Sequence, residues 1–510
     1  MPQQEISIIR SLLDPAIPLD TVSFGDLDTG TSTASTETKT EGQVKSMPVS
    51  KDLGTNYPYI EINNYVFSIE EIESFEINYT GFIPTVRLVA GVKGKTWGSE
   101  AIPKDGDLMN VFIRAKNDAF KPIRNDYRIT STSSKGANQE GSNAIYTITG
   151  ELFIPHLYDP KIQAYTGTSY ETLKNIAKEL KLGFASNDTA TNDSQTWINP
   201  GGDYYSLMLD IVDHAWKDEK SFFDAFIDVY YHLNFINVNN QFSENNDLDL
   251  ALLTNMQITD SVGGDQAALN LKENVAQVPK VLTNFPDLKG TPAYIFHYNL
   301  TNNSNTINED FGYKTYSQFF EQNSEKFWSI YTEPLTTVGA ASNKIILKGR
   351  TVRPGAPKEE YYKTQVKYEW KGIQYTAPEG NVHEKYAYAR GWNERNLAEL
   401  DKMLLNIDLE RGNFNLYRGE RLPLFLMIAG DNQYQNIAMP PEQGDPNTPA
   451  HPQPILDKFY SGYYMISGMT FSYSPQGKTN SGEYPNEEGR TAPGFTHKVQ
   501  LTRREWPTPI

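Results

Sequence analysis

Between Tyr57 and about residue 155 the chain consists of short segments in which apolar and polar residues alternate. This period of two is typical of half-buried β-strands, because successive side chains of a strand point to opposite faces of its sheet. The apolar positions of three such segments are Phe75, Ile77 and Tyr79; Val86, Leu88 and Ala90; and Ala144, Tyr146 and Ile148. Turn-forming pairs such as Thr80-Gly81 separate the segments. We therefore predict a small antiparallel β-barrel over residues 57–155.

A helical period replaces the alternation in the next region, residues 156–285. In SYETLKNIAKELKLGF the apolar residues recur every three or four positions, Ser169 is a candidate N-cap and Gly183 is placed to end the helix. A second helix is expected from about 204 to 216, and a third over SFFDAFIDVYYHL at 221–233, which runs into a strand-like segment. We predict a helical or mixed insertion domain here.

Alternation returns in residues 286–510, where we predict a second β-barrel. Two expected strands have their apolar residues at Val366, Tyr368 and Trp370 and at Leu405, Ile407 and Leu409, and a helix is expected at about 391–403. A loop at 429–458, rich in Pro, Asn and Gln, interrupts this domain. An ordered Pro-rich loop of about 30 residues is uncommon unless it binds something, so we expect it to contact another protein, with a surface decoration that has no partner as the alternative.

The N-terminal residues 1–56 differ from both regions. A short amphipathic patch is followed by Asp14-Pro15, which prevents a helix from continuing, and then by a polar, small-residue tether. The apolar residues of the patch are Ile6, Ile8, Ile9, Leu12 and Leu13. We predict an arm that docks on a neighbouring protein or subunit, with a free tail as the alternative.

An internal repeat links the two predicted barrels. Gly106 and Phe112 in the first fall in the same register as Gly419 and Phe425 in the second, with an acidic residue after each glycine. Downstream, Tyr127-Arg-Ile-Thr matches Tyr464-Met-Ile-Ser, and AIYTITGE at 144–151 matches HKVQLTRRE at 497–505. A repeat at this separation predicts two similar β-domains rather than a solenoid of short units.

The order of β-barrel, helical insertion and second β-barrel resembles the tail hub proteins of phages and related injection machines. These include the central baseplate hub, the late-control protein D group and the N-terminal half of the spike protein VgrG. The segments that carry the resemblance are SYETLKNIAKELKLGF, KSFFDAFIDVYYHLNFINVN and NERNLAELDKMLLNIDLERGNFNLYRGERLPLFL. The resemblance covers residues 57–510. Because the chain ends at Ile510 without a spike, we expect the spike to be a separate protein.

The resemblance implies a fold class and a function. The fold would be α+β, mainly β, with two tail-tube-like β-barrel domains and a helical insertion domain. The protein would be a structural baseplate hub, assembled in the host cytoplasm, and three copies would present six similar barrels that adapt a six-fold tail tube to a three-fold central spike. The implied partners are two further copies, the tail tube protein and the central spike protein, with baseplate wedge and tape-measure proteins as further candidates.

The amino-acid composition argues against several classes of function. The 510 residues carry 63 acidic and 46 basic side chains, a net charge of −17, which argues against general nucleic-acid binding and predicts a negative lining for a DNA channel. The absence of cysteine excludes disulfides, thiolate metal sites and cysteine nucleophiles. No apolar run approaches the roughly 18 residues of a membrane helix, so we expect no membrane insertion.

Candidate chemistry is sparse, and we expect no catalytic, metal-binding or ligand-binding residue and no cofactor. Gly94-Lys95-Thr96 lacks the first glycine of a phosphate loop, and His383-Glu384 lacks the second histidine of HExxH and is expected to be a solvated pair. Asp188, Asp193 and Asp203 could line a calcium loop, although no EF-hand glycine or terminal glutamate is present.

Asp210, Asp213 and His214 are expected on a solvated or subunit-facing helix surface. An alternative function class is a receptor-binding or carbohydrate-active tail spike, in which the Tyr-rich segments YYKTQVKYEW and FYSGYYMISG would stack on sugars. The helical insertion and the repeat favour the hub, because a sugar-binding spike needs neither.

Overall fold

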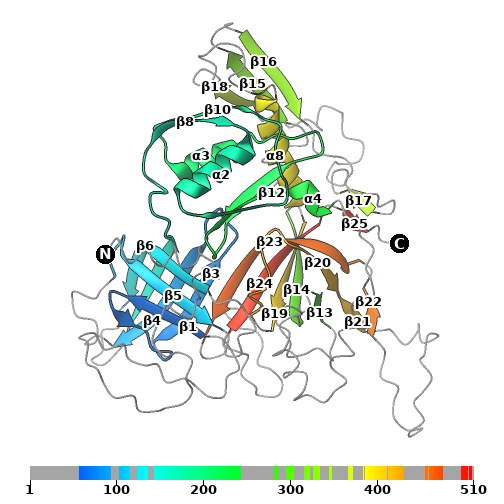
Figure 1. Cartoon of the computed structure of the whole chain (residues 1–510). Helices are drawn as coiled ribbons and strands as arrows, with labels where there is room; N and C mark the ends of the chain where they lie inside the picture. Colours follow the sequence, from blue (N-terminus) through cyan, green and yellow to red (C-terminus); the bar gives the residue numbers. More distant parts are fainter. Residues whose placement is uncertain are drawn as a thin grey trace, which may run out of the picture.

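The computed structural model shows a mostly β chain with large antiparallel sheets (Figure 1). It describes residues 57–93, 103–114, 123–135, 143–242, 281–284, 294–303, 315–321, 326–332, 344–346, 366–370, 383, 385–401, 403–410, 412–429, 454–457, 459–474, 495–503 and 505–507. The docking patch of the predicted N-terminal arm, Gly94-Lys95-Thr96, Glu384 and most of the loop at 429–458 lie outside these residues. No described helix is both long enough and apolar enough to cross a membrane.

The described residues of the first predicted barrel region form seven strands. They are β1 (Tyr57–Ile62), β2 (Tyr65–Val66), β3 (Ile72–Asn78), β4 (Thr85–Lys93), β5 (Leu108–Arg114), β6 (Ile123–Lys135) and β7 (Asn143–Leu152). The predicted alternation is confirmed in β3 and β4, where Phe75, Ile77, Val86, Leu88 and Ala90 are all buried. The strands pair in the spatial order β3-β4-β7-β6-β5-β1-β2.

The second predicted barrel region adds a similar series. Its strands are β13 (Leu282–Thr283), β14 (Ile295–Asn302), β19 (Met403–Leu409), β20 (Arg421–Phe425), β23 (Gly462–Tyr473) and β24 (Phe495–Thr502). They pair in the order β14-β19-β24-β23, with β20 on β23 and β13 on β20. Because β23 also pairs with β3, both regions belong to one 13-stranded sheet. Closure of either region into a barrel remains a prediction.

Within the described residues, the region between them carries helices α2, α3 and α4 and several short strands, drawn above the large sheet in Figure 1. Its elements are β8 (Ile162–Gly167), α2 (Ser169–Glu179), β9 (Gly183–Ser186), β10 (Gln195–Pro200), α3 (Tyr204–Asp213), β11 (Phe223–Ile227), β12 (His232–Asn237) and α4 (Val238–Phe242). Helices α2 and α3 confirm two predictions, but the N-cap of α2 is Thr168, whose hydroxyl accepts from the N–H of Glu171 in a capping box.

The helix predicted at 221–233 is wrong, because β11 and β12 form an antiparallel hairpin there. The Asp228 carboxylate accepts the N–H groups of Tyr230 and His232 at 2.8 and 2.9 Å, and Tyr231 takes a positive φ of 59°. An Asx turn of this kind reverses the chain without glycine or proline, so the continuous apolar run hides it.

The remaining elements lie outside the large sheet. They are β15 (Thr315–Glu321), β16 (Lys326–Thr332), β17 (Lys344–Ile346), β18 (Val366–Trp370), α8 (Tyr386–Leu400), β21 (Met427–Ala429), β22 (Pro454–Leu456) and β25 (Glu505–Pro507). Helix α8 begins five residues before the predicted start and packs Trp392 against Trp216 of the insertion region in a second apolar core. The main core is continuous from the first region through the insertion to the second.

Candidate assembly surfaces

The two repeat turns have the same hydrogen-bond pattern. The N–H of Gly106 donates to the carbonyl of Ile129 at 2.8 Å, and the N–H of Gly419 donates to that of Ile466 at 2.7 Å. In return, Ile129 and Ile466 donate to the carbonyls of the acidic residues after each glycine, at 2.8 and 2.9 Å. Both glycines have positive φ, 92° and 79°, which explains why glycine stands at both turns.

The aromatic residues of the repeat lie in the core. Phe112, Phe425, Tyr127 and Tyr464 are each at most 4% exposed. Tyr127 of β6 stands opposite Met109 of β5, and Tyr464 of β23 stands opposite Leu422 of β20, which is the same register in both hairpins. These residues therefore anchor two hairpins of the same geometry. Whether the hairpins meet in an assembly stays a prediction.

Irregularities in the strands also recur. One register shift falls between Ile72 and Ser74 in β3 and another between Ile295 and His297 in β14. A second pair of register shifts lies farther along the sheet, where the pairing skips Thr130 in β6 and Ser467 in β23. The hydroxyls of these two bulge residues donate to the carbonyls of Thr149 and Gln500, both at 3.3 Å. Bulges are specific local features, so their recurrence supports equivalence of the two strand series.

The hydrogen-bond register corrects one part of the sequence alignment. Ile129 pairs with Gly150 and Ile466 pairs with Leu501, so Gly150 is equivalent to Leu501. Ala144 then corresponds to Phe495, two residues before the His497 that the sequence match suggested. Pattern matching cannot fix this shift, because β7 and β24 alternate in the same way in either register.

A β-junction joins the two units inside the chain. Residues Asn78 to Phe75 of β3 pair antiparallel with Thr470 to Tyr473 of β23, and the N–H of Tyr79 donates to the carbonyl of Met469 at 2.8 Å. Two side-chain contacts accompany the pairing. The Tyr79 and Phe471 rings meet edge to face at 5.2 Å, and Ser472 donates to Glu76 at 3.4 Å. Strands almost 400 residues apart are thus edge-to-edge neighbours.

Arg418, directly before the second repeat turn, ties three regions together. Its guanidinium donates to the carbonyl of Gly81 at 2.5 Å and to the carboxylate of Asp224 at 3.2 Å, and it lies 4.5 Å from the ring centroid of Phe226. Gly81 belongs to the β3–β4 turn, whereas Asp224 and Phe226 belong to β11. A cleft of about 490 Å³ beside this contact is lined by both Asp224 and Arg418.

The insertion hairpin contacts both strand units. At its tip, Val229 accepts a hydrogen bond from the Asn125 side chain at 2.7 Å, and the hydroxyl of Tyr231 accepts the N–H of Asp126 at 3.2 Å. On the second unit, a Cβ placed on Gly419 would lie 2.3 Å from Cδ1 of Ile236, whereas one placed on Gly106 would meet no atom within 4 Å. The two repeat turns therefore differ in that only the second one packs against the insertion.

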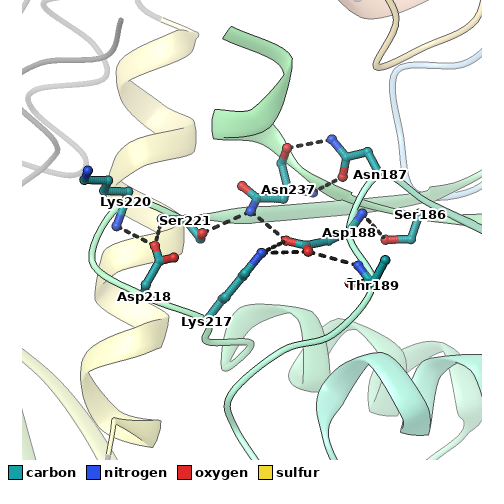
Figure 2. Close-up of polar contacts among 9 residues, drawn as sticks. All are labelled: Ser186, Asn187, Asp188, Thr189, Lys217, Asp218, Lys220, Ser221 and Asn237. Atoms are coloured by element: carbon teal, nitrogen blue, oxygen red, sulfur yellow. Dashed lines mark hydrogen bonds and ion pairs between the residues drawn. The ribbon is translucent and has the colours of Figure 1, made fainter. Parts of the chain in front are cut away.

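Figure 2 shows the polar network around Asp188, one of the three carboxylates considered for calcium. Lys217 lies 2.7 and 2.8 Å from its two oxygens, Asn237 donates to it at 3.0 Å and the N–H of Thr189 donates at 2.9 Å. Burial acts to raise the pKa of Asp188, but the hydrogen bonds from Asn237 and Lys217 outweigh burial and lower it. Asp188 thus ties β12 to the segment before β11.

The other two carboxylates have separate structural roles. Asp193 accepts the N–H groups of Ser169 and Trp216 at 2.9 and 2.8 Å, and Asp203 caps α3 by accepting the N–H of Ser206 at 2.7 Å. Within the described part of the chain, no group of three or more His, Asp or Glu side chains could hold a metal ion. The three aspartates are therefore not brought together.

Two histidines expected on solvated surfaces are buried instead. His214 stacks on Tyr386 of α8 with ring centroids 3.9 Å apart, so the prediction of a solvated or subunit-facing surface on α3 is wrong at this position. Asp210 remains beside it at 3.3 Å, and Asp213 lies 4.0 Å from Arg390 of α8. His383 is 8% exposed, and burial lowers its pKa to about 4. Helix α8, which starts earlier than predicted, covers both histidines.

Known proteins match this chain in structure but not in sequence. No protein-family model and no curated protein matches the sequence. The chain is similar to the tail protein of Neisseria meningitidis, with a TM-score of 0.44, 8% identity and 88% and 97% of the two chains covered. The 43 kDa tail protein of prophage MuSo2 from Shewanella oneidensis has a TM-score of 0.44, 9% identity and coverages of 88% and 99%.

A third neighbour is the Francisella PdpA-VgrG complex in its half-lidded form, with a TM-score of 0.37, 9% identity and 90% and 60% of the two chains covered. The three neighbours are thus two tail proteins, one of them from a prophage, and a VgrG complex. The likeness is distant, and residue roles come from this chain's own contacts.

Proposed function

We infer that the chain is a structural hub protein of a phage tail baseplate. Three copies form a ring that adapts the six-fold tail tube to the three-fold central spike and encloses the DNA channel. The observation that supports this function is the repetition of one strand order, β3-β4-β7-β6-β5 and β14-β19-β24-β23-β20, with bulges at equivalent positions.

Symmetry connects this repetition to the function. A closed ring of identical chains presents each surface as many times as it has subunits. A chain with two equivalent strand units presents that unit six times in a trimer, which matches a six-fold tube, while every other feature appears three times. The tail tube protein would contact the six units, and the central spike protein would contact the three-fold features.

Two regions outside the described residues belong to the same proposal. The N-terminal arm, through Ile6, Ile8, Ile9, Leu12 and Leu13, would dock on a neighbouring protein, because burial of such side chains contributes about 1.5–3 kcal/mol each. The loop at 429–458 would contact the spike or a baseplate wedge protein. Three copies with a net charge of −17 each carry −51, which would keep transiting DNA from adhering to the channel.

Reconstitution tests the function. The purified chain should have three times its monomer mass of 57.7 kDa in light scattering and should nucleate polymerisation of the particle's tail tube protein. Electron microscopy should then show the chain at one end of each tube. A trimer that neither binds the spike nor nucleates tubes would contradict the hub function, and glycan binding by that trimer would favour the receptor-binding alternative.

A further inference from the structure

The junction between β3 and β23 has an unoccupied counterpart between β14, the strand at one end of the large sheet, and the part of β6 that extends past its neighbour β5. Equivalent registers make β14 the counterpart of β3 and β6 the counterpart of β23. Among the described residues, β14 pairs with β19 along one edge, and near the other edge Tyr294, directly before β14, forms an isolated bridge with Thr283 of β13. Asn299, Leu300 and Thr301 have no described strand partner on that second edge. Strand β6 pairs with β5 only from Ile123 to Arg128, and the Thr132 hydroxyl donates to the carbonyl of Pro103 at 3.5 Å. The β5-side edge of Ser133–Lys135 has no strand partner in the described sheet.

The equivalence assigns a register to this missing pair. Thr470, Phe471 and Ser472 of β23 correspond to Ser133, Ser134 and Lys135 of β6, counted from the shared bulge. Asn78, Ile77 and Glu76 of β3 correspond to Thr301, Leu300 and Asn299 of β14. The internal pairs Thr470 with Asn78, Phe471 with Ile77 and Ser472 with Glu76 therefore translate into Ser133 with Thr301, Ser134 with Leu300 and Lys135 with Asn299.

We propose that β14 of one copy adds to the free edge of β6 in the next copy, in this register, and that the large sheet thereby continues from subunit to subunit. The proposal deepens the proposed function, since it rests on ring assembly, and it names the second copy of this chain as the occupant. The interface is head-to-tail, which closes into a ring when the rotation per subunit divides a full turn.

Burial at the two edges agrees with a missing neighbour. In β3, which has its partner, Phe75 and Ile77 are fully buried. The equivalent Tyr298 and Leu300 of β14 are only half-buried, and Asn299 is exposed. On β6 the residues Ser133 to Lys135 are all exposed. An edge strand with unpaired backbone groups is a template for strand addition, and hydrogen bonds from both backbones would satisfy those groups.

Cysteine cross-linking tests the register, because the natural chain has no cysteine. The variants are K135C/N299C and S134C/L300C, two adjacent pairs of which one falls at a non-hydrogen-bonded site. Directly opposed residues have Cβ atoms about 4.5–5.5 Å apart, close enough for a disulfide after small adjustment. Mild oxidation of the full-length protein should give covalent dimers and closed covalent trimers on a non-reducing denaturing gel, and reducing agent should return monomers.

Two matched controls accompany these variants. E76C/S472C occupies the equivalent site of the internal junction, so its disulfide should form within one chain and leave the mass unchanged. K135C/L300C shifts the register by one residue and places the two thiols on opposite faces of the sheet, so it should cross-link at least tenfold less than K135C/N299C. Native mass measurement of each variant confirms that the cysteines leave assembly intact.

The outcomes separate this interface from the hub function. Native trimers that give no covalent species at either pair, while E76C/S472C does close, would overturn the β14–β6 pairing and leave the trimeric hub standing. Covalent ladders that extend beyond three chains would support the pairing and contradict the three-fold ring. A chain that stays monomeric at about 100 μM, where an interface with a Kd of about 1 μM would be formed, would overturn both.

Discussion

Substitution of Gly419 by alanine tests how tightly the second repeat turn packs against the insertion, and Gly106→Ala is its matched control. Both glycines have positive φ, so a Cβ costs about 1–2 kcal/mol at either position. Only at Gly419 does the new Cβ collide, 2.3 Å from Cδ1 of Ile236. Overpacking adds about 1–3 kcal/mol, toward the lower end here because a side-chain tip can move.

We expect G419A to lower the free energy of unfolding by about 1–3 kcal/mol more than G106A. Urea unfolding followed by circular dichroism and tryptophan fluorescence measures this difference in stability. Ile236→Val completes a double-mutant cycle with G419A, because it removes the methyl group that collides with the new Cβ. The double variant G419A/I236V should recover most of the excess loss. Equal destabilisation by G106A and G419A, within about 0.5 kcal/mol, would refute close packing of turn and insertion, and so would a double variant without recovery.

Three further predictions concern single side chains. Arg418→Lys keeps the charge but cannot span Gly81 and Asp224 together, so it should cost about 1–3 kcal/mol of stability in urea unfolding, and an undiminished midpoint would contradict the tie. Asp188→Asn removes the negative charge that pairs with Lys217 and one of its two acceptor oxygens, and it should cost about 1.5–3 kcal/mol, measured in the same way, without any change in bound metal by elemental analysis. Burial lowers the pKa of His497 to about 3, so the unfolded chain takes up the proton first as pH falls below about 6.5. Stability should therefore drop by about 2 kcal/mol from this residue between pH 7 and pH 5, and His497→Gln should abolish that part of the drop.

Local signals explain what could be predicted from the sequence. Strands β3 and β4 alternate cleanly because one face is buried and the other is not, and α2 carries apolar residues at helical spacing with a capping box at its start. The repeat turns were visible because Gly106 and Gly419 are required by positive φ. Each of these features is encoded within about ten residues, so a pattern in the chain is enough to find it.

Features that depend on distant residues were not predictable in this way. Strand β11 packs against α3, α4 and α8 and is buried at four of its five positions, so its apolar run lacks alternation. The β3–β23 junction leaves no local trace, since any strand with a free edge could pair there. The sequence contains one signal for the role of Arg418: a cation stands directly before the repeated glycine Gly419, whereas the first copy has Asp105 at the equivalent position.

The difference between Arg418 and Asp105 suggests how the proposed ring could contact both a six-fold tube and a three-fold spike. The strand units share their order, turns and bulges, so in the proposed ring they form six nearly equivalent surfaces toward the tube. The insertion packs against Gly419 and is held by Arg418, whereas the Gly106 turn is open and acidic. Alternate units are thus marked by different neighbours and opposite charge, and a partner that contacts the marked surface encounters it three times rather than six. In the proposed ring, the reduction from six-fold to three-fold would be a consequence of where the insertion packs, because the repeated strands alone would preserve six-fold equivalence.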